Sequence, residues 1–120
     1  MKYGVVGNRN GWMIGFVLQK LRELNISASD TIISGGADGV DSMAQTYAKL
    51  MGCTLVIHYP DPKLSSPYRY FARNKDIAEE CDVLVAFDKG SSGGSGTLNT
   101  INHAKKLNKK VVLYSKQGGE

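Results

Sequence analysis

At 120 residues, with 42% hydrophobic and 22% charged residues, the chain is long enough for one folded domain, and these values exclude two domains and a disordered chain. Its net charge of +4 is mild; it suits an anionic ligand such as a phosphate or a nucleic acid, or reflects solvated lysines alone. No apolar run approaches the roughly 18 residues of a membrane span, and two histidines without clustered cysteines give no support for a metal site. We expect a cytoplasmic protein with one domain over residues 1–115, a tail over residues 116–120, no metal and no cofactor.

The first predicted strand and helix lie in the first 24 residues. Tyr3 to Val6 is an apolar run typical of a strand, and a turn with two glycines follows it. From Trp12 to Leu24 the apolar residues have helical spacing, and in the first turns they point in nearly every direction. Such a helix is covered on more than one side, so we expect it to lie in the interface of a homodimer or tetramer.

The second strand and helix have the clearest pattern. Thr31 to Ile33 is a short predicted strand that ends in a Ser-Gly-Gly turn. Asp38 is placed to cap the next helix, with Asp41 three residues later, and Gly52 is the expected end. The apolar stripe of this helix consists of Val40, Met43, Ala44, Tyr47, Ala48 and Met51.

Three strands and two helices are predicted in the second half of the chain. The strands are Thr54 to Tyr59, Val83 to Phe87 and Val111 to Tyr114. The helices are Pro67 to Glu80, which buries Phe71, Ile77, Ala78 and Cys81, and Thr97 to Leu107, with a stripe at Leu98, Ile101, Ala104 and Leu107.

Alternation of strands and helices predicts the fold class. Strand–helix–strand units have right-handed crossovers, which make the strands parallel and place helices on both faces of one sheet. We predict an α/β fold of Rossmann-like type, a three-layer sandwich whose five-stranded parallel sheet has the order 3-2-1-4-5.

Glycine-rich loops follow the first, second and fourth predicted strands. Ligands of such sheets bind beyond the carboxyl ends of the strands. Gly35-Gly36 and the run Gly93-Gly94-Ser95-Gly96-Thr97 each lead into a helix N-terminus, where free amides and the helix dipole favour an anion. Alternatively, these glycines only provide the positive φ angles of tight turns. The spacing matches neither the dinucleotide fingerprint nor the P-loop.

Polar residues near these loops are candidate ligand contacts. The first two loops contribute Gly7, Asn8, Arg9 and Ser34. Arg73 suits bidentate recognition of phosphate or carboxylate, or it is a surface arginine. Asn74 lies on the buried face of its helix, and because an unpaired buried amide costs about 1–3 kcal/mol, it should have a partner.

Acidic, aromatic and sulfur-containing residues have two interpretations each. Asp41 is a partner of the helix dipole or an acceptor for a ribose hydroxyl, and in an enzyme Asp41, Asp88 and Arg73 are the candidate catalytic groups. His58 is hydrogen-bonded at a strand end or lines a pocket, and Trp12 packs in the core or an interface or stacks on a base. Cys53 and Cys81 are expected to be reduced and buried.

The segment Ser-Gly-Gly-Ala-Asp-Gly-Val-Asp-Ser-Met-Ala, from Ser34 to Ala44, closely resembles a hallmark of the SLOG superfamily. That superfamily includes the DNA-processing protein A (Smf) domain, the LOG enzymes and small YspA-like proteins. Arg73-Asn74, with Ala78 and the segment from Asp82 to Phe87, resembles the YspA-like branch, and the run from Gly93 to Thr97 is similar to the second glycine motif of the superfamily. The resemblance covers about Met1 to Tyr114.

The resemblance implies a Rossmann-like domain that holds a nucleotide or a nucleotide-derived molecule in its glycine loops. By matched position, it implies ligand contacts at Gly35, Gly36, Asp41, Arg73, Asn74, Gly94, Gly96 and Thr97. The LOG enzymes have a glutamate shortly after the second motif, whereas this chain has Leu98, Asn99 and Thr100 there. This departure argues against LOG-type hydrolysis.

We therefore expect a module that binds an anionic nucleotide or nucleotide-derived small molecule, as a sensor or by sequestration. The first alternative is an enzyme that cleaves a nucleotide N-glycosidic bond, similar to a phosphoribohydrolase. The second is single-stranded nucleic-acid binding, although we expect no strong basic patch with interleaved aromatic residues.

Overall fold

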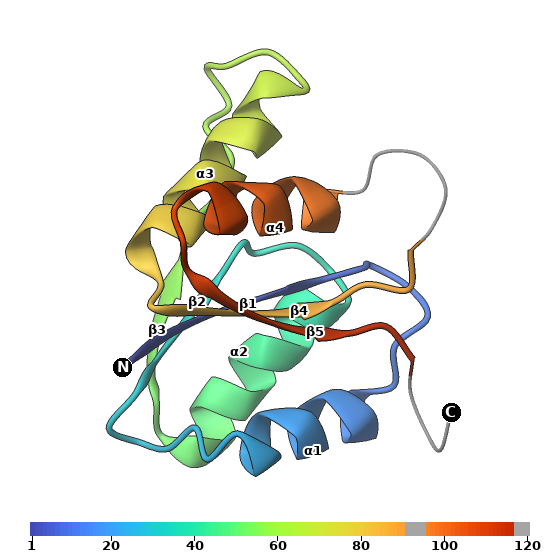
Figure 1. The fold of residues 1–120 in the computed structure, drawn as a ribbon, viewed down its shortest axis with the longest axis vertical. Coiled ribbons are helices and arrows are strands. Elements are labelled where there is room, and N and C mark those ends of the chain that lie inside the picture. The colour runs from blue at the N-terminus through green and yellow to red at the C-terminus, as the bar shows by residue number, and fades with distance from the viewer. Residues whose placement is uncertain (91–95, 117–120) are drawn as a thin grey trace.

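Five parallel strands in the order β3-β2-β1-β4-β5 form the centre of the fold (Figure 1), as predicted for a Rossmann-like α/β protein. The computed structural model describes residues 1–90 and 96–116. The elements are β1 (Lys2–Gly7), α1 (Ile14–Glu23), β2 (Thr31–Ser34), α2 (Val40–Met51), β3 (Thr54–Ile57), α3 (Tyr68–Glu80), β4 (Val83–Phe87), α4 (Gly96–Lys106) and β5 (Lys110–Tyr114). Within the described ranges, no helix is long and apolar enough to cross a membrane.

The division into a domain over residues 1–115 and a tail over residues 116–120 stays a prediction.

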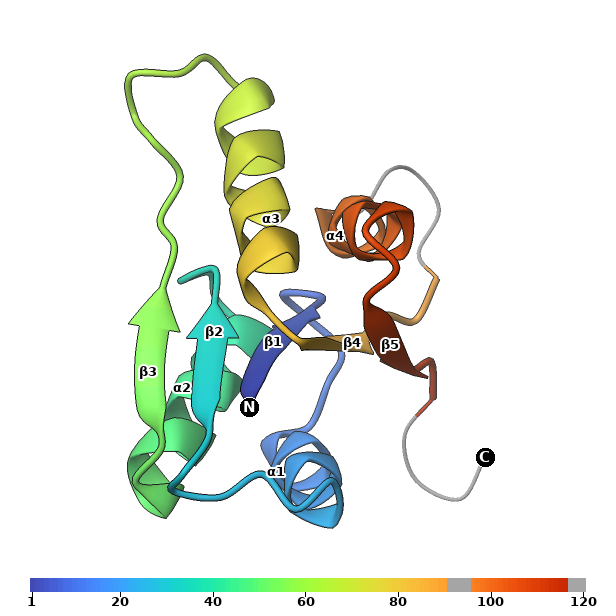
Figure 2. The same cartoon turned by 60° about the vertical axis from the view of Figure 1, so that its left-hand side comes forward.

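Helices cover both faces of the sheet, α1 and α2 on one face and α3 and α4 on the other (Figures 1 and 2). Neighbouring residues of a strand contribute to different layers, because side chains alternate between the two faces. Val5 and Val85 belong to the core under α1 and α2, whereas Val6 and Ala86 belong to the core under α3 and α4.

The predicted cap of α2 is wrong. The N-cap residue is Gly39, and no side-chain cap hydrogen bond is present there, so Asp38 does not cap the helix. Asp41 instead reaches back from the first turn and accepts a hydrogen bond from the amide of Ala37 at 3.2 Å. The C-terminal prediction is confirmed, since Gly52 adopts the left-handed conformation with φ of 75°.

Four apolar side chains predicted to be buried are exposed, and one of them is Met51 at the C-terminal end of α2, which is 39% exposed. Phe71 is 42% exposed because the first turns of α3 project beyond the sheet (Figure 2). Leu98 and Leu107 are exposed because the buried face of α4 is rotated relative to the predicted stripe. That face consists of Thr97, Thr100, Ile101 and Ala104.

The aromatic side chains before and within α1 pack inside the molecule. Trp12 is buried, and its ring lies 5.4 Å from that of Phe87 in an edge-on arrangement. Phe16 makes edge-on contacts with Phe87 and Tyr114, both at 6.4 Å between centroids. The core interpretation of Trp12 is therefore confirmed, which excludes Trp12 as an open stacking platform.

Both cysteines are free thiols. Cys81 is buried as predicted, whereas Cys53 is half-buried. Burial raises the pKa of both thiols, and burial is the largest cause in each case. Neither thiol is therefore activated as a nucleophile.

The chain after β1 crosses directly over the start of α2. The carbonyl of Asn8 accepts a hydrogen bond from the amide of Val40 at 3.3 Å. A Cβ atom on Gly39 would lie 2.3 Å from the carbonyl oxygen of Arg9, and Gly39 has φ of 77°, in the left-handed region. Only glycine fits at this crossing, which brings Arg9 and Asp41 to the same edge of the sheet.

We expect Gly39→Ala to lower the free energy of unfolding by about 2 kcal/mol or more, because the left-handed backbone costs an L residue about 1–2 kcal/mol and the clash with Arg9 adds to it. Gly15→Ala is the matched control: nothing lies within 4 Å of the Cβ position of Gly15 in α1, so alanine should stabilise by up to about 1 kcal/mol. Urea unfolding followed by circular dichroism measures both. Equal stabilities of the two variants would contradict the requirement for Gly39.

Candidate functional site

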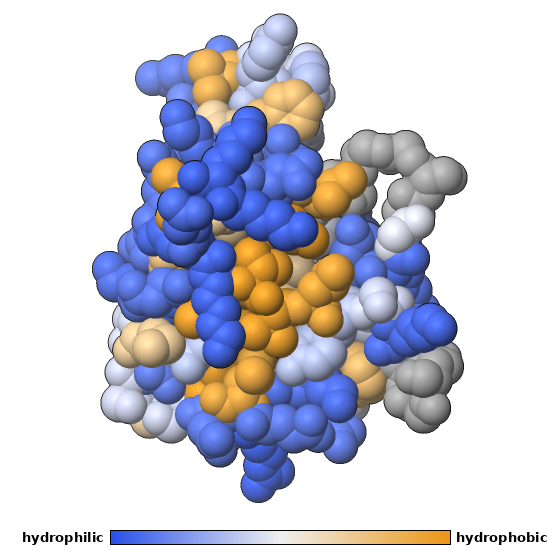
Figure 3. Space-filling view, in the orientation of Figure 1, coloured by the Kyte–Doolittle hydropathy of each residue, from blue (hydrophilic) through white to orange (hydrophobic). Residues whose placement is uncertain are grey.

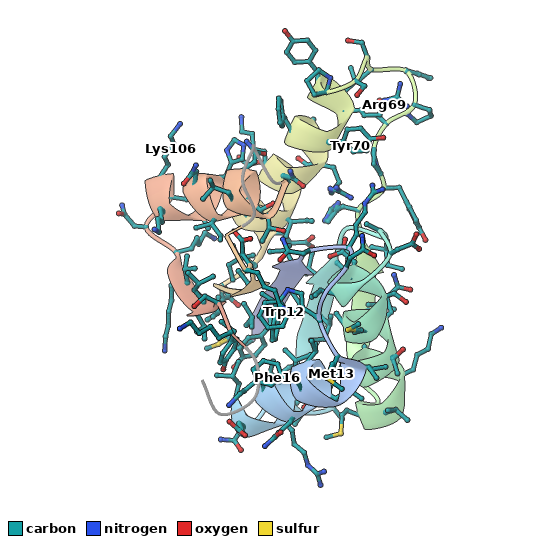
Figure 4. All side chains as sticks on the ribbon, turned by 90° about the vertical axis from the view of Figure 1, so that its right-hand side faces the viewer. Trp12, Met13, Phe16, Arg69, Tyr70 and Lys106 are labelled. Carbon is teal, nitrogen blue, oxygen red and sulfur yellow. The ribbon has the colours of Figure 1, made fainter. Side chains whose placement is uncertain are left out.

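A cavity of about 470 Å³ lies at the carboxyl ends of the central strands, where the strand order reverses. Figure 4 looks onto this edge of the sheet, with Trp12 near its centre. Eight predicted contacts line the cavity: Gly7, Asn8, Arg9, Asp41, Arg73, Asn74, Gly96 and Thr97. The described part of the lining has three cationic side chains, Arg9, Arg73 and Lys89, and one carboxyl group, that of Asp41.

The backbone of Gly35 lies between Arg73 and Asp41. The guanidinium of Arg73 donates a hydrogen bond from Nη1 to the carbonyl oxygen of Gly35. A Cβ atom on Gly35 would lie 2.6 Å from that Nη1 atom and 2.9 Å from Oδ2 of Asp41. Glycine is required here for close approach to two charged side chains, so the structure supports a role beyond that of a tight turn.

Asp41 has an unusual carboxyl group for a residue in the first turn of a helix. It is only 6% exposed, and burial raises its pKa from 3.8 to about 6. The hydrogen bond from the amide of Ala37 and the positive charges of Arg73 and Arg9 oppose this rise. The group therefore titrates close to neutral pH, where it can accept or transfer a proton.

The amides of the loop after β2 are largely occupied by the protein itself. The Ala37 amide is bonded to Asp41, and the Gly36 amide lies 3.5 Å from the hydroxyl of Ser34. The expectation of free amides in this loop is thus wrong, because the carboxyl of Asp41 takes the place of an external anion. An anionic ligand would have to be held by the cationic side chains and by the loops after β1 and β4.

Asn74 connects α3 to the first turns of α4. It is 3% exposed, and its Oδ1 atom accepts a hydrogen bond from Nε of Arg73 at 2.8 Å. Its Nδ2 atom donates to the carbonyl of Gly96 at 3.3 Å and to Oδ1 of Asn99 at 3.1 Å. The expected partners of this buried amide are confirmed, and through them Asn74 fixes both the Arg73 side chain and the start of α4.

Asn8 connects the loops that follow β1 and β4. Its Oδ1 atom accepts hydrogen bonds from Nε1 of Trp12 and from the amide of Lys89, both at 3.0 Å. Its Nδ2 atom donates to Oδ1 of Asp88 at 3.2 Å. The ammonium group of Lys89 lies 5.3 Å from the centroid of the Trp12 ring, within cation–π distance. This network holds the Lys89 backbone beside the cavity.

Several predicted residues lie behind or outside the cavity. Ser34 is fully buried and donates a hydrogen bond to the backbone carbonyl of Asp41 at 3.2 Å. Asp88 accepts hydrogen bonds from Asn8 and from the amide of Gly90, and does not line the cavity. His58 forms a hydrogen bond with Glu80, as predicted for a strand end. Gly93, Gly94 and Ser95 lie outside the described residues.

Three polar lining residues were not predicted as contacts: Asn10, Lys89 and Thr100. Thr100 lies three residues after Thr97, so helical spacing places both on the face of α4 that borders the cavity. Lys89 is the second residue after β4, and its position in the sequence was a usable signal, because polar residues after a central parallel strand reach the ligand edge.

Within the described part of the chain, no group of three or more His, Cys, Asp or Glu side chains is placed to hold a metal ion.

Several solved structures share this fold. DNA processing protein A (DprA) from Streptococcus pneumoniae matches with a TM-score of 0.79 and 19% identity, over 99% of this chain and 52% of that chain. DNA processing protein A from Helicobacter pylori, whose structure addresses its single-stranded DNA binding mode, matches with a TM-score of 0.73 and 20% identity, over 100% of this chain and 67% of that chain. The protein TM1055 matches with a TM-score of 0.68 and 24% identity, over 92% of this chain and 72% of that chain.

These similarities establish the fold alone, because sequence identity is low and one fold hosts many functions. The chain spans about half the length of the Streptococcus pneumoniae protein. Neither a family model nor a curated protein matches the sequence. Membership of the SLOG superfamily and of its YspA-like branch stays a prediction.

We expect the buried carboxyl of Asp41 to reduce stability as pH rises. The folded state holds this proton up to about pH 6, while the unfolded state loses it near pH 3.8, so the unfolded state binds fewer protons in between and the free energy of unfolding falls with pH. The full effect is about 3 kcal/mol, of which about 2 kcal/mol develops between about pH 4 and about pH 8.

Asp41→Asn removes this titration while keeping an oxygen acceptor for the Ala37 amide. Urea unfolding measures the free energy of unfolding of the wild type and of Asp41→Asn across this pH range. Relative to the wild type, the value for the variant should rise by about 2 kcal/mol as pH increases. Asp76→Asn, at an exposed position of α3, controls for the loss of one negative charge. A difference between wild type and Asp41→Asn that stays constant with pH would show that the carboxyl is not buried as described.

Proposed function

We propose that the chain binds an anionic nucleotide or nucleotide-derived small molecule in this cavity, as a sensor or by sequestration. The observation that carries the proposal is the presence of Arg9, Arg73 and Lys89 around a cavity that also contains the buried carboxyl of Asp41. A nucleotide has an anionic phosphate, which matches the three cationic side chains. It also has neutral hydroxyl groups, which match the carboxyl group of Asp41. The volume of about 470 Å³ lies within the range of small-molecule sites.

The phosphate is best accommodated away from Asp41, because two anions at close range repel one another. Arg9 and Lys89 are exposed cations on the loops after β1 and β4. Gly96 and Thr97, in the first turn of α4, also line the cavity, and a helix N-terminus favours an anion through its dipole. These groups together form the phosphate side of the proposed site.

The sugar is best accommodated beside Asp41. Above about pH 6 this carboxyl is ionised, and an ionised carboxylate accepts hydrogen bonds from hydroxyl donors. Tyr59 provides an aromatic surface nearby: its ring is largely exposed, and it lies against Gly36, where a Cβ atom would be 2.7 Å from the ring. The resemblance of the glycine motifs to those of the SLOG superfamily supports the same class of ligand.

Cleavage of an N-glycosidic bond is the enzymatic alternative, and the pKa of Asp41 favours it. A carboxyl group that titrates near neutral pH is suited to general acid or base catalysis. Asp88, the other candidate acid, does not line the cavity. Because the described lining contains a single carboxyl group, we place binding ahead of catalysis.

Single-stranded nucleic-acid binding is the second candidate, and one surface favours it. The projecting end of α3 carries Tyr68, Arg69, Tyr70 and Phe71, so that one basic residue lies among three aromatic residues. Figure 4 labels Arg69 and Tyr70 of this segment. Tyr68 is 66% exposed, and the guanidinium of Arg69 lies 6.0 Å from the centroid of the Tyr70 ring. Arg69 and Tyr70 are half-buried and this segment contains a single basic residue, so the expectation that no strong basic patch with interleaved aromatic residues exists stays a prediction. Bases stack on exposed aromatic rings, and the Helicobacter pylori protein described above binds single-stranded DNA.

We expect isothermal titration to detect binding of adenosine monophosphate, and weaker binding of adenosine, which lacks the phosphate. Arg9→Ala should weaken binding of the monophosphate by about tenfold or more, because a charge-assisted hydrogen bond contributes about 1.5–3 kcal/mol. Lys63→Ala, in the exposed loop before α3, is the matched control and should bind as the wild type does. Absence of binding by any nucleotide at millimolar concentration would refute the proposal, and equal effects of the two variants would place the ligand elsewhere.

The nucleic-acid candidate makes a different prediction. The affinity for an oligothymidylate should fall steeply as salt rises, because binding releases counterions. Tyr68→Ala should weaken this binding by about fivefold or more, since stacking of one base contributes about 1–3 kcal/mol, and should leave nucleotide affinity unchanged. Fluorescence anisotropy with labelled oligonucleotide measures both effects, and no binding at low salt rules this candidate out.

A further inference from the structure

The outer edge of β5 presents backbone groups that no described strand pairs with. β5 is the last strand in the sheet order, and Phe87 of β4 is the partner of Tyr114 in the ladder. The amide of Asp88 donates to the carbonyl of Tyr114 at 3.0 Å, so the backbone groups of Tyr114 face β4. Backbone N–H and C=O groups of successive residues in a strand point to alternate sides, so the backbone groups of Val111 and Leu113 point away from β4 and the rest of the sheet.

The sequence of β5 lacks the features that usually protect an edge strand. Natural edges are blocked by proline, by charged residues within the strand or by bulges. β5 reads Lys-Val-Val-Leu-Tyr, with its only charge at the first position, and Leu113 is 53% exposed. Figure 3 shows hydrophobic side chains gathered on the face where β5 lies. The other edge strand, β3, is shorter, and its apolar side chains are half-buried.

We propose that a second copy of this chain pairs with β5, antiparallel and about a two-fold axis at Val112, to form a continuous ten-stranded sheet. In this register Val111 lies opposite Leu113 of the second copy, and their outward backbone groups form a hydrogen-bonded pair. Val112 lies opposite Val112 in a non-hydrogen-bonded pair. The strand is thus complementary to itself in both backbone and side chains.

The charges near β5 fit the same register. Lys110 lies opposite Tyr114 of the second copy, and Lys109 lies opposite Ser115, so no lysine of one copy directly faces a lysine of the other. An ammonium group beside an aromatic ring is a favourable pair. Like charges directly opposite would destabilise the pairing, and this register avoids them.

The position of α4 is also compatible with the proposed dimer. α4 contacts both β4 and β5, which places it over the space between these strands. With strands about 4.8 Å apart, the two α4 axes of the dimer would lie about 10 Å apart, which is the usual distance for packed helices. Val111 packs on the core under α3 and α4, so Leu113, two residues later, lies on the same face and would be covered in the dimer.

The proposal is independent of ligand binding, because no residue of β5 lines the cavity. It also differs from the expectation that α1 forms the interface. Met13, just before α1, is 69% exposed and offers a matched position at which to test that expectation.

Light scattering on a sizing column tests the proposal. We expect the wild type at about 26 kDa, twice the 13.0 kDa of one chain. Leu113→Lys should give monomers with an unchanged circular dichroism spectrum, because the side chain is exposed in one copy and the charge would face apolar residues of the other. Met13→Lys should remain dimeric. A monomeric wild type, or a dimer lost in Met13→Lys and kept in Leu113→Lys, would overturn the proposal.

Cysteine substitution tests the register itself. Val112→Cys should form an intermolecular disulfide on mild oxidation, because non-hydrogen-bonded partners have Cα atoms about 4.5 Å apart, within disulfide reach. Leu113→Cys should not, because its symmetry mate is displaced by two residues along the strand and lies beyond about 7 Å. Equal cross-linking of the two variants, or none in either, would refute this register.

Discussion

The crossing of the chain after β1 over the start of α2 determines where the polar groups of the cavity lie. Gly39 leaves room for the carbonyl of Arg9, and the amide of Val40 donates to the carbonyl of Asn8, so the loops after β1 and β2 are held together. From this crossing Asp41 extends toward the glycine loop, and Arg73 approaches the same loop from α3. The cavity is thus formed by backbone approach that only glycine permits, and its charged groups are placed by that approach.

Burial of Asp41 is the feature of the site that stability alone does not explain. A buried carboxylate disfavours the folded state, and the positive charges of Arg73 and Arg9 offset only part of this effect, since the pKa remains raised to about 6. Such perturbed groups are common at functional sites. The carboxyl also occupies the amides that a phosphate would otherwise use, which directs an anionic ligand toward Arg9, Lys89 and the start of α4. Under the proposed function, the cavity therefore accepts the sugar beside Asp41 and the phosphate beside Arg9 and Lys89.

The fold could be predicted from the sequence because apolar periodicity depends on local spacing, and the strand order 3-2-1-4-5 is a common order of doubly wound parallel sheets. The role of Asp38 could not, because the left-handed backbone of Gly39 separates it from the helix and leaves Asp41 as the group that bonds the loop. The exposure of Phe71 depends on how far α3 extends beyond the sheet, which spacing does not encode. Arg73 and Asn74 were predicted as site residues and line the cavity, and Lys89 could have been predicted from its place after β4, whereas the hydrogen bonds of Asn8 that hold its backbone link residues distant in sequence.

A carbon-13 NMR titration of the Asp41 carboxyl tests the central claim most directly. The account predicts a pKa of about 6 in the free protein, and a carboxyl resonance that moves at about pH 7 when adenosine monophosphate is added, since the ligand would contact this group. A pKa near the ordinary value of 3.8 would contradict the buried carboxyl at the centre of the site. A resonance that the nucleotide leaves in place would contradict the proposed binding.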